Sequence, residues 1–329
     1  MDFAELMRLA SGHVEARLIQ TAVALAIFDA LDNAPATAQA VAQQLKLEPK
    51  ATELLLNALA SLELLHKHAQ QFSLGEAATK YLLKSSPHYV GGMIRFDGSL
   101  WRCWEKLPEA IRSGQPVRPP NMYQDDPEET EIFIQAMNSL VTARGDTEVM
   151  ANIFHWSEIT ELLDVGSGPA TYPISLCQLF PWLRATIFDL PATLNLTKKY
   201  VREAGMLERI RLMAGDYRND PIAGSYDLIF LSNIIHGESL ENNRSLIRKL
   251  FTNLKAGGRI VVKDHILDDS RAAPPVGALF SLLMLLTTES GRCYSFNEVK
   301  NWMEQAGLSQ VRQIDLPPPL TSSLVIGTR

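Results

Sequence analysis

The sequence has few cysteines, no excess of basic residues and no long apolar run. Its three cysteines, Cys103, Cys177 and Cys293, show neither metal-site spacing nor an even disulfide framework, so we expect no metal and a reducing, cytoplasmic location. The net charge of −6 offers no attraction to nucleic acid or to an anionic membrane. No uncharged apolar run reaches about 18 residues, and no basic segment precedes an apolar core at the amino terminus, so we expect neither a transmembrane span nor a signal peptide.

The composition is that of a globular protein. At 329 residues the chain is long enough for two domains, each with a core of its own. Apolar residues make up 46% and charged residues 21%, which lies in the usual range for soluble proteins. We therefore look for two folded domains and for motifs that distinguish them.

The clearest motif is the glycine-containing segment 161–172. An apolar run leads into Gly166 and Gly168, and helix-compatible sequence follows from Tyr172. This order predicts a strand that turns sharply into a helix, with glycines where the backbone passes close to a ligand. The third glycine of a dinucleotide-binding fingerprint is absent, with Pro169-Ala170 following Gly168, and an ordinary tight turn would also fit the segment by itself.

Three further apolar runs also end in polar residues. They are 185–188 before Asp189, 210–214 before Gly215-Asp216, and 226–231 before Ser232-Asn233. In open α/β sheets the carboxyl ends of the strands bind ligands, and an acid at Asp189 would accept hydrogen bonds from a ribose. Because the phosphate-binding glycines are incomplete, the pattern favours S-adenosylmethionine, which has no phosphate, over NAD.

The carboxyl-terminal half alternates strand-type and helical segments. It continues with a helix over 241–254 that ends at Ala256-Gly257-Gly258, a fifth strand over 259–263 that leads to Asp264, and a hairpin of 311–316 with 323–327. Such alternation predicts a mostly parallel sheet covered on both faces. The predicted class is α/β, with a Rossmann-like doubly wound domain.

The amino-terminal part reads as an all-α winged-helix domain. Helices are expected within 3–31, over 37–45 and over 50–65, followed by a small hairpin over 66–74. The segment around Phe28 is so densely apolar that we expect a helix buried against another subunit.

Many winged-helix domains bind DNA, but this one lacks the charge for it. The helix that would read bases carries Glu48 and Glu53, and residues 1–95 hold eight Lys or Arg against nine Asp or Glu. A dimerisation and substrate-lid domain is the favoured interpretation.

Residues 96–150 are predicted to be a helical connector. An amphipathic helix from Trp101 to Ile111 ends at Ser113-Gly114, the loop 117–127 follows, and a second helix covers 128–143. On that second helix, Met137 and Asn138 are candidates for lining a substrate pocket, although apolar residues in such helices usually belong to the core.

His236 is the candidate general base, because it follows the fourth predicted strand at the ligand edge. An imidazole is largely unprotonated near neutral pH and can take a proton from a hydroxyl, while a sulfonium cofactor already carries an electrophilic methyl group. Asp264 is expected to orient the imidazole or to hold a substrate hydroxyl, and a salt-bridged acid is the alternative. Glu238 is a weaker candidate, and His155 and His265 are interpreted as structural.

Nearly the whole chain resembles the dimeric small-molecule O-methyltransferases. This family is typified by the plant caffeic acid enzymes, hydroxyindole O-methyltransferase and bacterial polyketide and pigment methyltransferases. The resemblance rests on the winged-helix pattern and on five motifs: Trp101-x-x-Trp104 to Arg112-x-Gly114-x-Pro116, Leu163-Asp-Val-Gly-Ser-Gly168, Phe188-Asp-Leu-Pro191, Ala214-Gly-Asp216 and Ile235-His236.

The resemblance implies a class I S-adenosylmethionine-dependent enzyme of the bacterial secondary-metabolite branch, forming homodimers through its amino-terminal domain. Gly166 would approach the methionine part of the cofactor, Asp189 would hold the ribose, Asp216 and Tyr217 would border the adenine, and Ser232 would lie near the cofactor. The apolar run 277–286, with Phe280 and Met284, resembles a substrate-facing helix, which suggests a hydrophobic acceptor.

The chain departs from the family pattern near its histidine. The family usually has His-Asp-Trp where this chain has His236-Gly237-Glu238, and often a basic residue where Ser232 stands. Asp264 corresponds to a glutamate that orients the histidine, and a second glutamate aligns near Cys293 and is absent.

We therefore expect three domains: a winged-helix dimerisation domain over 1–95, a connector that lines the substrate pocket over 96–150, and a methyltransferase domain over 151–329. The expected reaction is methylation of a hydroxyl on an aromatic or polyketide-like metabolite, with no nucleic acid or membrane partner. Carbon or nitrogen methylation on the same fold is the nearest alternative. A winged-helix DNA-binding regulator and an NAD-dependent dehydrogenase are the more distant ones.

Overall fold

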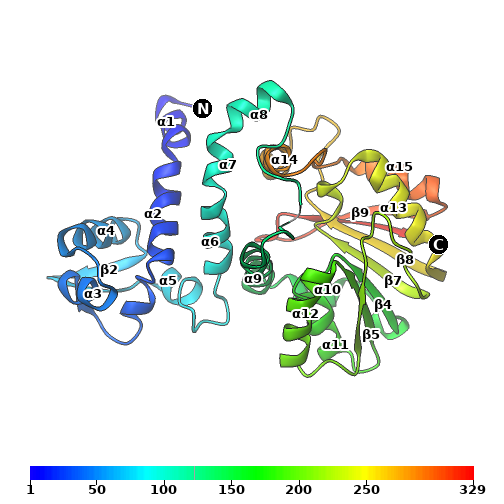
Figure 1. Ribbon diagram of the computed structural model, residues 1–329, viewed down its shortest axis with the longest axis horizontal. Coiled ribbons are helices and arrows are strands. Elements are labelled where there is room, and N and C mark those ends of the chain that lie inside the picture. The colour runs from blue at the N-terminus through cyan, green and yellow to red at the C-terminus, as the bar shows by residue number, and fades with distance from the viewer. Residues whose placement is uncertain (122) are drawn as a thin grey trace. The chain divides into compact units, whose positions relative to one another are not determined.

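The computed structural model describes residues 1–121 and 123–329, so Met122, inside the predicted loop 117–127, lies outside the described residues. The described residues include no helix with the length and apolar character needed to cross a membrane. Figure 1 shows the order of helices and strands along the chain.

The described chain forms two compact units. The first combines Met1–Trp101 with Gln135–Ala143, and the second combines Arg102–Ile134 with Arg144–Arg329. The three-domain division expected from the sequence stays a prediction.

The first unit is mainly helical and carries a small antiparallel sheet of order β1-β3-β2. Its elements are α1 (Phe3–Ser11), α2 (His13–Ala24), η1 (Asp29–Leu31), β1 (Ala36–Thr37), α3 (Ala38–Leu45), α4 (Pro49–Ser61), β2 (Leu65–His68), β3 (Gln71–Leu74), α5 (Glu76–Tyr81) and α6 (Gly91–Ser99). β2 and β3 form the hairpin that the sequence predicts. β1 adds a third strand that the sequence does not predict. It pairs with β3 over only two residues, which is too short for an alternating apolar pattern.

The predicted helix around Phe28 needs correction. α2 ends at Ala24, and the chain turns through Ala26, whose φ is +56°, before η1. Ile27 and Phe28 are fully buried in the core of the first unit, in a cluster that also contains Leu56. The high apolar content of this segment is therefore explained by packing within the unit and not by a second subunit.

The predicted connector helix is also divided. Its two parts are α7 (Trp101–Glu105) and α8 (Leu107–Ser113). Pro108, in the first turn of α8, has no N–H to continue the α7 hydrogen-bond ladder, so a new helix begins there. Gly114 ends α8 in the left-handed conformation with φ +67°, as predicted, and the following long helix is α9 (Pro127–Arg144).

The second unit contains a seven-stranded sheet of order β6-β5-β4-β7-β8-β10-β9. Its strands are β4 (Glu161–Val165), β5 (Arg184–Asp189), β6 (Ile210–Ala214), β7 (Tyr226–Ser232), β8 (Leu254–Asp264), β9 (Ser309–Asp315) and β10 (Ser323–Thr328). The first five are parallel to one another, and β10 is antiparallel to β8 and pairs with β9 in the predicted terminal hairpin. The predicted doubly wound α/β fold is confirmed.

Helices cover both faces of this sheet, with α10, α11 and α12 on one side and α13 and α15 on the other (Figure 1). The remaining helical elements are η2 (Trp156–Glu158), α10 (Asp146–Ile153), α11 (Thr171–Leu179), α12 (Pro191–Glu203), η3 (Ile235–Gly237), α13 (Leu240–Thr252), α14 (Pro275–Thr287) and α15 (Phe296–Ala306). The helix predicted to reach 254 ends at Thr252. Leu254 already pairs with Tyr226 of β7, so the glycine pair 257–258 lies inside β8.

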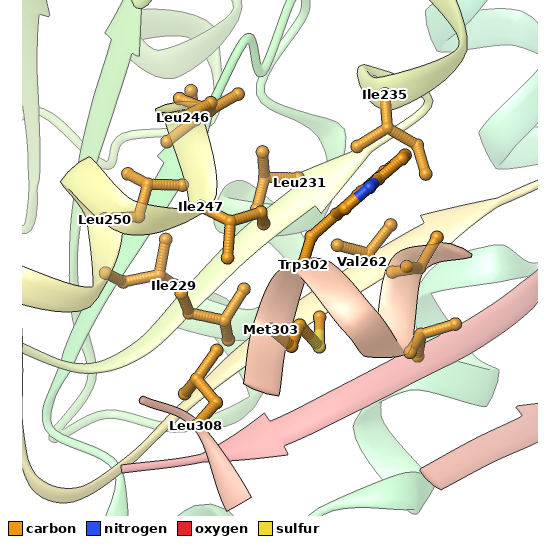
Figure 2. Close-up of a cluster of buried hydrophobic side chains, with 14 of the residues drawn as sticks. Ile229, Leu231, Ile235, Leu246, Ile247, Leu250, Val262, Trp302, Met303 and Leu308 are labelled. Atoms are coloured by element: carbon orange, nitrogen blue, oxygen red, sulfur yellow. The ribbon is translucent and has the colours of Figure 1, made fainter. Parts of the chain in front are cut away.

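A continuous apolar core lies between the sheet, α13 and α15 (Figure 2). In Figure 2 the Trp302 ring of α15 extends toward Val262 of β8 and Ile235 of η3. Trp302 is 2% exposed and Ile235 is 1% exposed. Because Ile235 directly precedes His236, this core fixes the turn that carries the predicted base.

We expect Trp302→Ala to lower the free energy of unfolding by about 3 to 5 kcal/mol, because the surrounding core cannot collapse to fill the lost indole. Urea unfolding followed by circular dichroism measures the change. Leu179→Ala is the matched control, because Leu179 is 54% exposed on α11. Equal shifts in the two variants would contradict the assigned core.

Candidate active site

Five parallel strands end along one edge of the second unit. β6, β5, β4, β7 and β8 are consecutive neighbours in the sheet. The residues at their carboxyl ends, or one or two positions beyond them, are Asp216, Asp189, Gly166, Ser232 and Asp264. The structure thus brings together at one sheet edge the predicted residues that come from separate strands, as the strand pattern indicates.

Gly166 and Gly168 shape the turn after β4. Both have left-handed φ values, +67° and +59°, which favour glycine. A Cβ atom at Gly166 would lie 2.3 Å from the Cδ1 atom of Ile234, so a side chain there would force Ile234 to move. The N–H of Gly166 donates to the carbonyl of Phe188 at 2.8 Å, which ties this turn to the end of β5.

Asp189 lies at the end of β5, beside the glycine turn. Its carboxylate accepts hydrogen bonds from the backbone N–H groups of Gly168 at 2.8 Å and of Leu190 at 2.7 Å. Burial raises the pKa of Asp189 to about 6, although these hydrogen bonds and one from Thr193 act in the opposite direction. A buried acceptor next to a close-approach turn suits a ribose diol.

Asp164, in β4, is a second buried acid that the sequence reasoning missed. It is 1% exposed, and Oδ2 accepts a hydrogen bond from the Ser167 hydroxyl at 2.6 Å. Oδ1 has no hydrogen-bond partner among the described residues. Burial raises the pKa of Asp164 to about 7. An acid inside an otherwise apolar strand before two glycines is the sequence signal that could have identified it.

Tyr217 and Glu238 are joined at the same edge. The Tyr217 hydroxyl donates to Glu238 Oε1 at 2.8 Å, and Arg218 forms an ion pair with the same oxygen at 2.7 Å. Asn242 donates to Glu238 Oε2 at 2.9 Å. Glu238 is thus a buried anchor that holds the segment after β6, and the structure favours this role over the catalytic one considered from the sequence.

His236 and Asp264 form the closest pair of predicted catalytic groups. The Nδ1 atom of His236 lies 2.7 Å from Asp264 Oδ1, and the backbone N–H of His265 donates to the same oxygen at 2.7 Å. Burial alone would raise the pKa of Asp264, but the charge and hydrogen bond of His236 hold it below its usual value. Because a carboxylate can only accept, Nδ1 carries the proton and Nε2 is the atom that can receive one.

Phe280, on α14, lies against both histidines of this region. Its ring centroid is 4.8 Å from that of His236 and 4.9 Å from that of His265. His265 donates from Nδ1 to the Thr321 carbonyl at 3.0 Å, because a carbonyl oxygen only accepts. Burial lowers the pKa of His265. An aromatic side chain against the predicted base supports an apolar acceptor site.

The other substrate candidates are Met284, Met137 and Asn138. Met284 is a buried residue of α14. Met137 and Asn138 belong to the part of α9 that is assigned to the first unit. Their roles, like those of the cofactor-binding candidates, stay predictions.

A buried ionic cluster lies on the face of the sheet that α10 and α11 cover, and the sequence reasoning missed it entirely. We call it the Asp146 cluster; it consists of Arg144, Asp146, Tyr172 and Lys263. Asp146 and Lys263 are both 0% exposed, and Lys263 Nζ lies 2.9 Å from Asp146 Oδ2. Burial lowers the pKa of Lys263, although the negative charge of Asp146 opposes this effect. A lysine inside an apolar strand was the available signal.

The described residues contain no group of three or more His, Cys, Asp and Glu side chains that could hold a metal ion.

Family models match most of the chain. The O-methyltransferase domain matches residues 107–309, and the O-methyltransferase dimerisation domain matches residues 7–84.

Characterised relatives align over almost the full length. The chain is 30% identical to the 3-hydroxy-5-methyl-1-naphthoate 3-O-methyltransferase of Streptomyces sahachiroi, over 98% of this chain and 94% of the relative. It is 29% identical to the tetracenomycin polyketide synthesis 8-O-methyltransferase TcmO of Streptomyces glaucescens, over 99% and 96%.

A solved structure is similar over the whole chain. Human N-acetylserotonin methyltransferase in complex with S-adenosylmethionine superposes with a TM-score of 0.90 at 25% identity, covering 100% of this chain and 98% of the human chain. Together with the sheet edge described above, these similarities show that the chain belongs to the family of S-adenosylmethionine-dependent O-methyltransferases.

Proposed function

We propose that this enzyme methylates a hydroxyl group of a hydrophobic, aromatic or polyketide-like small molecule, with His236 as the general base. The observation that carries the proposal is the 2.7 Å contact between His236 Nδ1 and Asp264 Oδ1 at the carboxyl ends of β7 and β8. The relatives named for naphthoate and tetracenomycin substrates support the acceptor class.

The residues at the sheet edge fit the cofactor. Gly166 allows the turn after β4 to pack directly against Ile234, because a Cβ there would collide with that side chain. Asp189 offers a buried carboxylate for the ribose, and Asp164 Oδ1 offers an acceptor without a partner among the described residues. Asp216, Tyr217 and Ser232 complete the proposed cofactor site. When bound, the cofactor supplies a methyl group activated by its sulfonium.

The role of the chain is then to prepare the acceptor. Asp264 holds the His236 ring with Nδ1 protonated, so Nε2 can take the proton of the acceptor hydroxyl as the oxygen attacks. The Asp264 carboxylate also stabilises the imidazolium that forms. Phe280, at 4.8 Å from the His236 ring, presents an apolar surface to an aromatic acceptor. Alignment of acceptor and methyl group supplies the rest of the acceleration.

We also propose a homodimer formed through the amino-terminal domain. The dimerisation model matches residues 7–84. α1 keeps large apolar side chains exposed, with Phe3 at 79%, Leu6 at 54% and Leu9 at 56%. Such a face is typical of a protein–protein contact.

Incubation with S-adenosylmethionine and candidate naphthols or polyketides, followed by mass spectrometry, tests the function directly. We expect products heavier by one CH2 group and methylated on oxygen. Transfer confined to nitrogen or carbon would contradict the proposed acceptor group.

We expect His236→Ala to reduce the rate of methyl transfer by about 100-fold or more, the usual scale for loss of a general base. Cofactor affinity should remain close to that of the unaltered enzyme. Single-turnover kinetics and isothermal titration calorimetry measure the two quantities. His155→Ala, at an exposed histidine, is the control, and an unchanged rate in His236→Ala would exclude the proposed base.

We expect Asp189→Ala to weaken S-adenosylmethionine binding by about 1 to 3 kcal/mol, because ribose hydroxyls would lose a buried acceptor. Calorimetric titration measures the change. Asp269→Ala removes an acid from the exposed loop after β8 and should leave the affinity unaltered. Unaltered binding in Asp189→Ala would show that the ribose lies elsewhere.

Cofactor affinity should rise with pH between about 5.5 and about 7.5. The raised pKa values of Asp164, about 7, and Asp189, about 6, mean that each acid loses its proton within this interval. Binding of a cationic amino group and of ribose donors favours the ionised acids, so binding releases the protons that the acids hold. For each proton released, the affinity rises by up to about tenfold per pH unit. Titrations of S-adenosylhomocysteine across this interval should show a shallower slope in Asp164→Asn. An equal slope would contradict the assignment.

A further inference from the structure

Two imidazoles, those of His236 and His265, share one carboxylate oxygen at the end of β8. Asp264 Oδ1 accepts from Nδ1 of His236 and from the backbone N–H of His265, both at 2.7 Å. Asp264 is 1% exposed, so its carboxylate is closed to a bound molecule. A substrate that reaches this end of β8 therefore meets the imidazole rings and not the acid beneath them.

The His265 ring is held in one orientation and one tautomer. Its Nδ1 atom donates to the carbonyl of Thr321 at 3.0 Å, and burial lowers the pKa of the imidazole, so the ring is neutral and Nε2 carries no proton. Asp264 fixes the tautomer of His236 in the same way.

The Nε2 atoms of both rings are open acceptors. Within the described chain no hydrogen bond reaches either Nε2 atom. The buried polar side-chain atoms without a partner in that part of the chain belong to Trp156, Asp164 and Asn243. Since neither Nε2 is among them, both open onto accessible space, where a hydrogen-bond donor can bind.

Helix α14 brings the two rings against one apolar side chain. The Phe280 ring centroid lies 4.8 Å from that of His236 and 4.9 Å from that of His265. A Cβ atom at Gly277 would lie 2.8 Å from Leu267 Cδ2 and 3.6 Å from His265 Cβ, so α14 packs directly onto the residues that follow β8. An aromatic substrate beside Phe280 would thus have an imidazole at two points of its edge.

The two imidazoles differ in the group that supports Nδ1. The carboxylate of Asp264 stabilises the positive charge that forms when His236 takes a proton, whereas Thr321 offers His265 a neutral carbonyl. His265 is therefore suited to accept a hydrogen bond and poorly suited to remove a proton. A substrate that satisfies both rings needs two donors, of which the one at His236 is deprotonated.

We propose that His265 is a specificity-determining residue, whose Nε2 accepts a hydrogen bond from a second hydroxyl of the substrate while the first hydroxyl faces His236. The inference rests on the proposed function and narrows its substrate class to aromatic diols and polyphenols. The oxygen of the first hydroxyl gains the methyl group, the methyl–sulfur bond breaks with its electron pair left on sulfur, and the proton goes to His236 Nε2. The second hydroxyl keeps its proton. This role differs from the structural one expected for His265 from the sequence.

The arrangement also predicts that a diol is methylated once. In the monomethyl ether, the remaining hydroxyl can face His236 only if the ether oxygen faces His265. An ether oxygen has no proton to donate, so two hydrogen-bond acceptors would oppose each other at Nε2.

The experiment compares three substrates with the unaltered enzyme and S-adenosylmethionine: a dihydroxynaphthalene, its monomethyl ether, and the naphthol that lacks the second hydroxyl. A panel of dihydroxynaphthalene isomers identifies the diol that is methylated fastest. We expect its kcat/KM to exceed those of the other two substrates by about tenfold, the scale of one hydrogen bond left unmade. Mass spectrometry of the products measures the rates and counts the methyl groups transferred.

His265→Phe keeps a flat ring beside Phe280 and removes the Nε2 acceptor. We expect kcat/KM for the diol to fall about tenfold, through KM more than through kcat, because the lost hydrogen bond is present before and during methyl transfer. The value for the naphthol should stay within about twofold, since the naphthol makes no bond to Nε2. His155→Phe, at an exposed histidine, is the control and should leave all three values unaltered.

Equal kcat/KM for the three substrates in the unaltered enzyme would overturn the role of His265, and this comparison stays valid if His265→Phe folds poorly. An equal loss for all three substrates in His265→Phe would also overturn it, because that is the result of a purely structural role. Both outcomes leave the proposed function standing. If the unaltered enzyme methylated no phenolic oxygen at all, the proposed function would fail, and the role of His265 with it.

Discussion

The hydrogen bond between His236 and Asp264 is the interaction on which the proposed active site depends. It joins a turn after β7 to the last residue of β8, and it requires that two neighbouring parallel strands end at the same level. The 2.7 Å separation fixes both the ring orientation and the protonated nitrogen. Each of the two groups is held by a separate rigid element, so the distance between them is fixed more firmly than it would be on a single flexible loop.

Packing on both faces of the sheet holds the His236–Asp264 pair in place. Trp302 and the α13 residues bury Ile235, which leaves His236 little freedom to move away from the sheet (Figure 2). On the other face the Asp146 cluster ties α10 and α11 to β8, one residue before Asp264. β8 is thus held by an apolar core on one face and by an ionic cluster on the other.

The sequence predicted what depends on local pattern. Strand-end residues such as Asp189 and His236 were found because alternating apolar and polar runs specify where parallel strands end. Contacts between distant segments were not found, since nothing local to Lys263 indicates that Asp146 lies beside it. The predicted end of the helix at Leu254 was wrong, because pairing between β7 and β8 decides where this helix ends. The partner of Glu238 was missed for the same reason, because Tyr217 approaches it only through the folded sheet.

The Asp146 cluster has a consequence for how this chain can vary. Asp146 and Lys263 are 117 positions apart in sequence and in direct contact, and both are sealed from water. Loss of Asp146 alone would leave the Lys263 charge in the interior without its carboxylate, whereas loss of Lys263 alone would leave Asp146 paired with Arg144. Asp146 is therefore constrained to be lost in descent only together with Lys263 or after it. A lineage that lost Asp146 first would pass through a poorly folded ancestor.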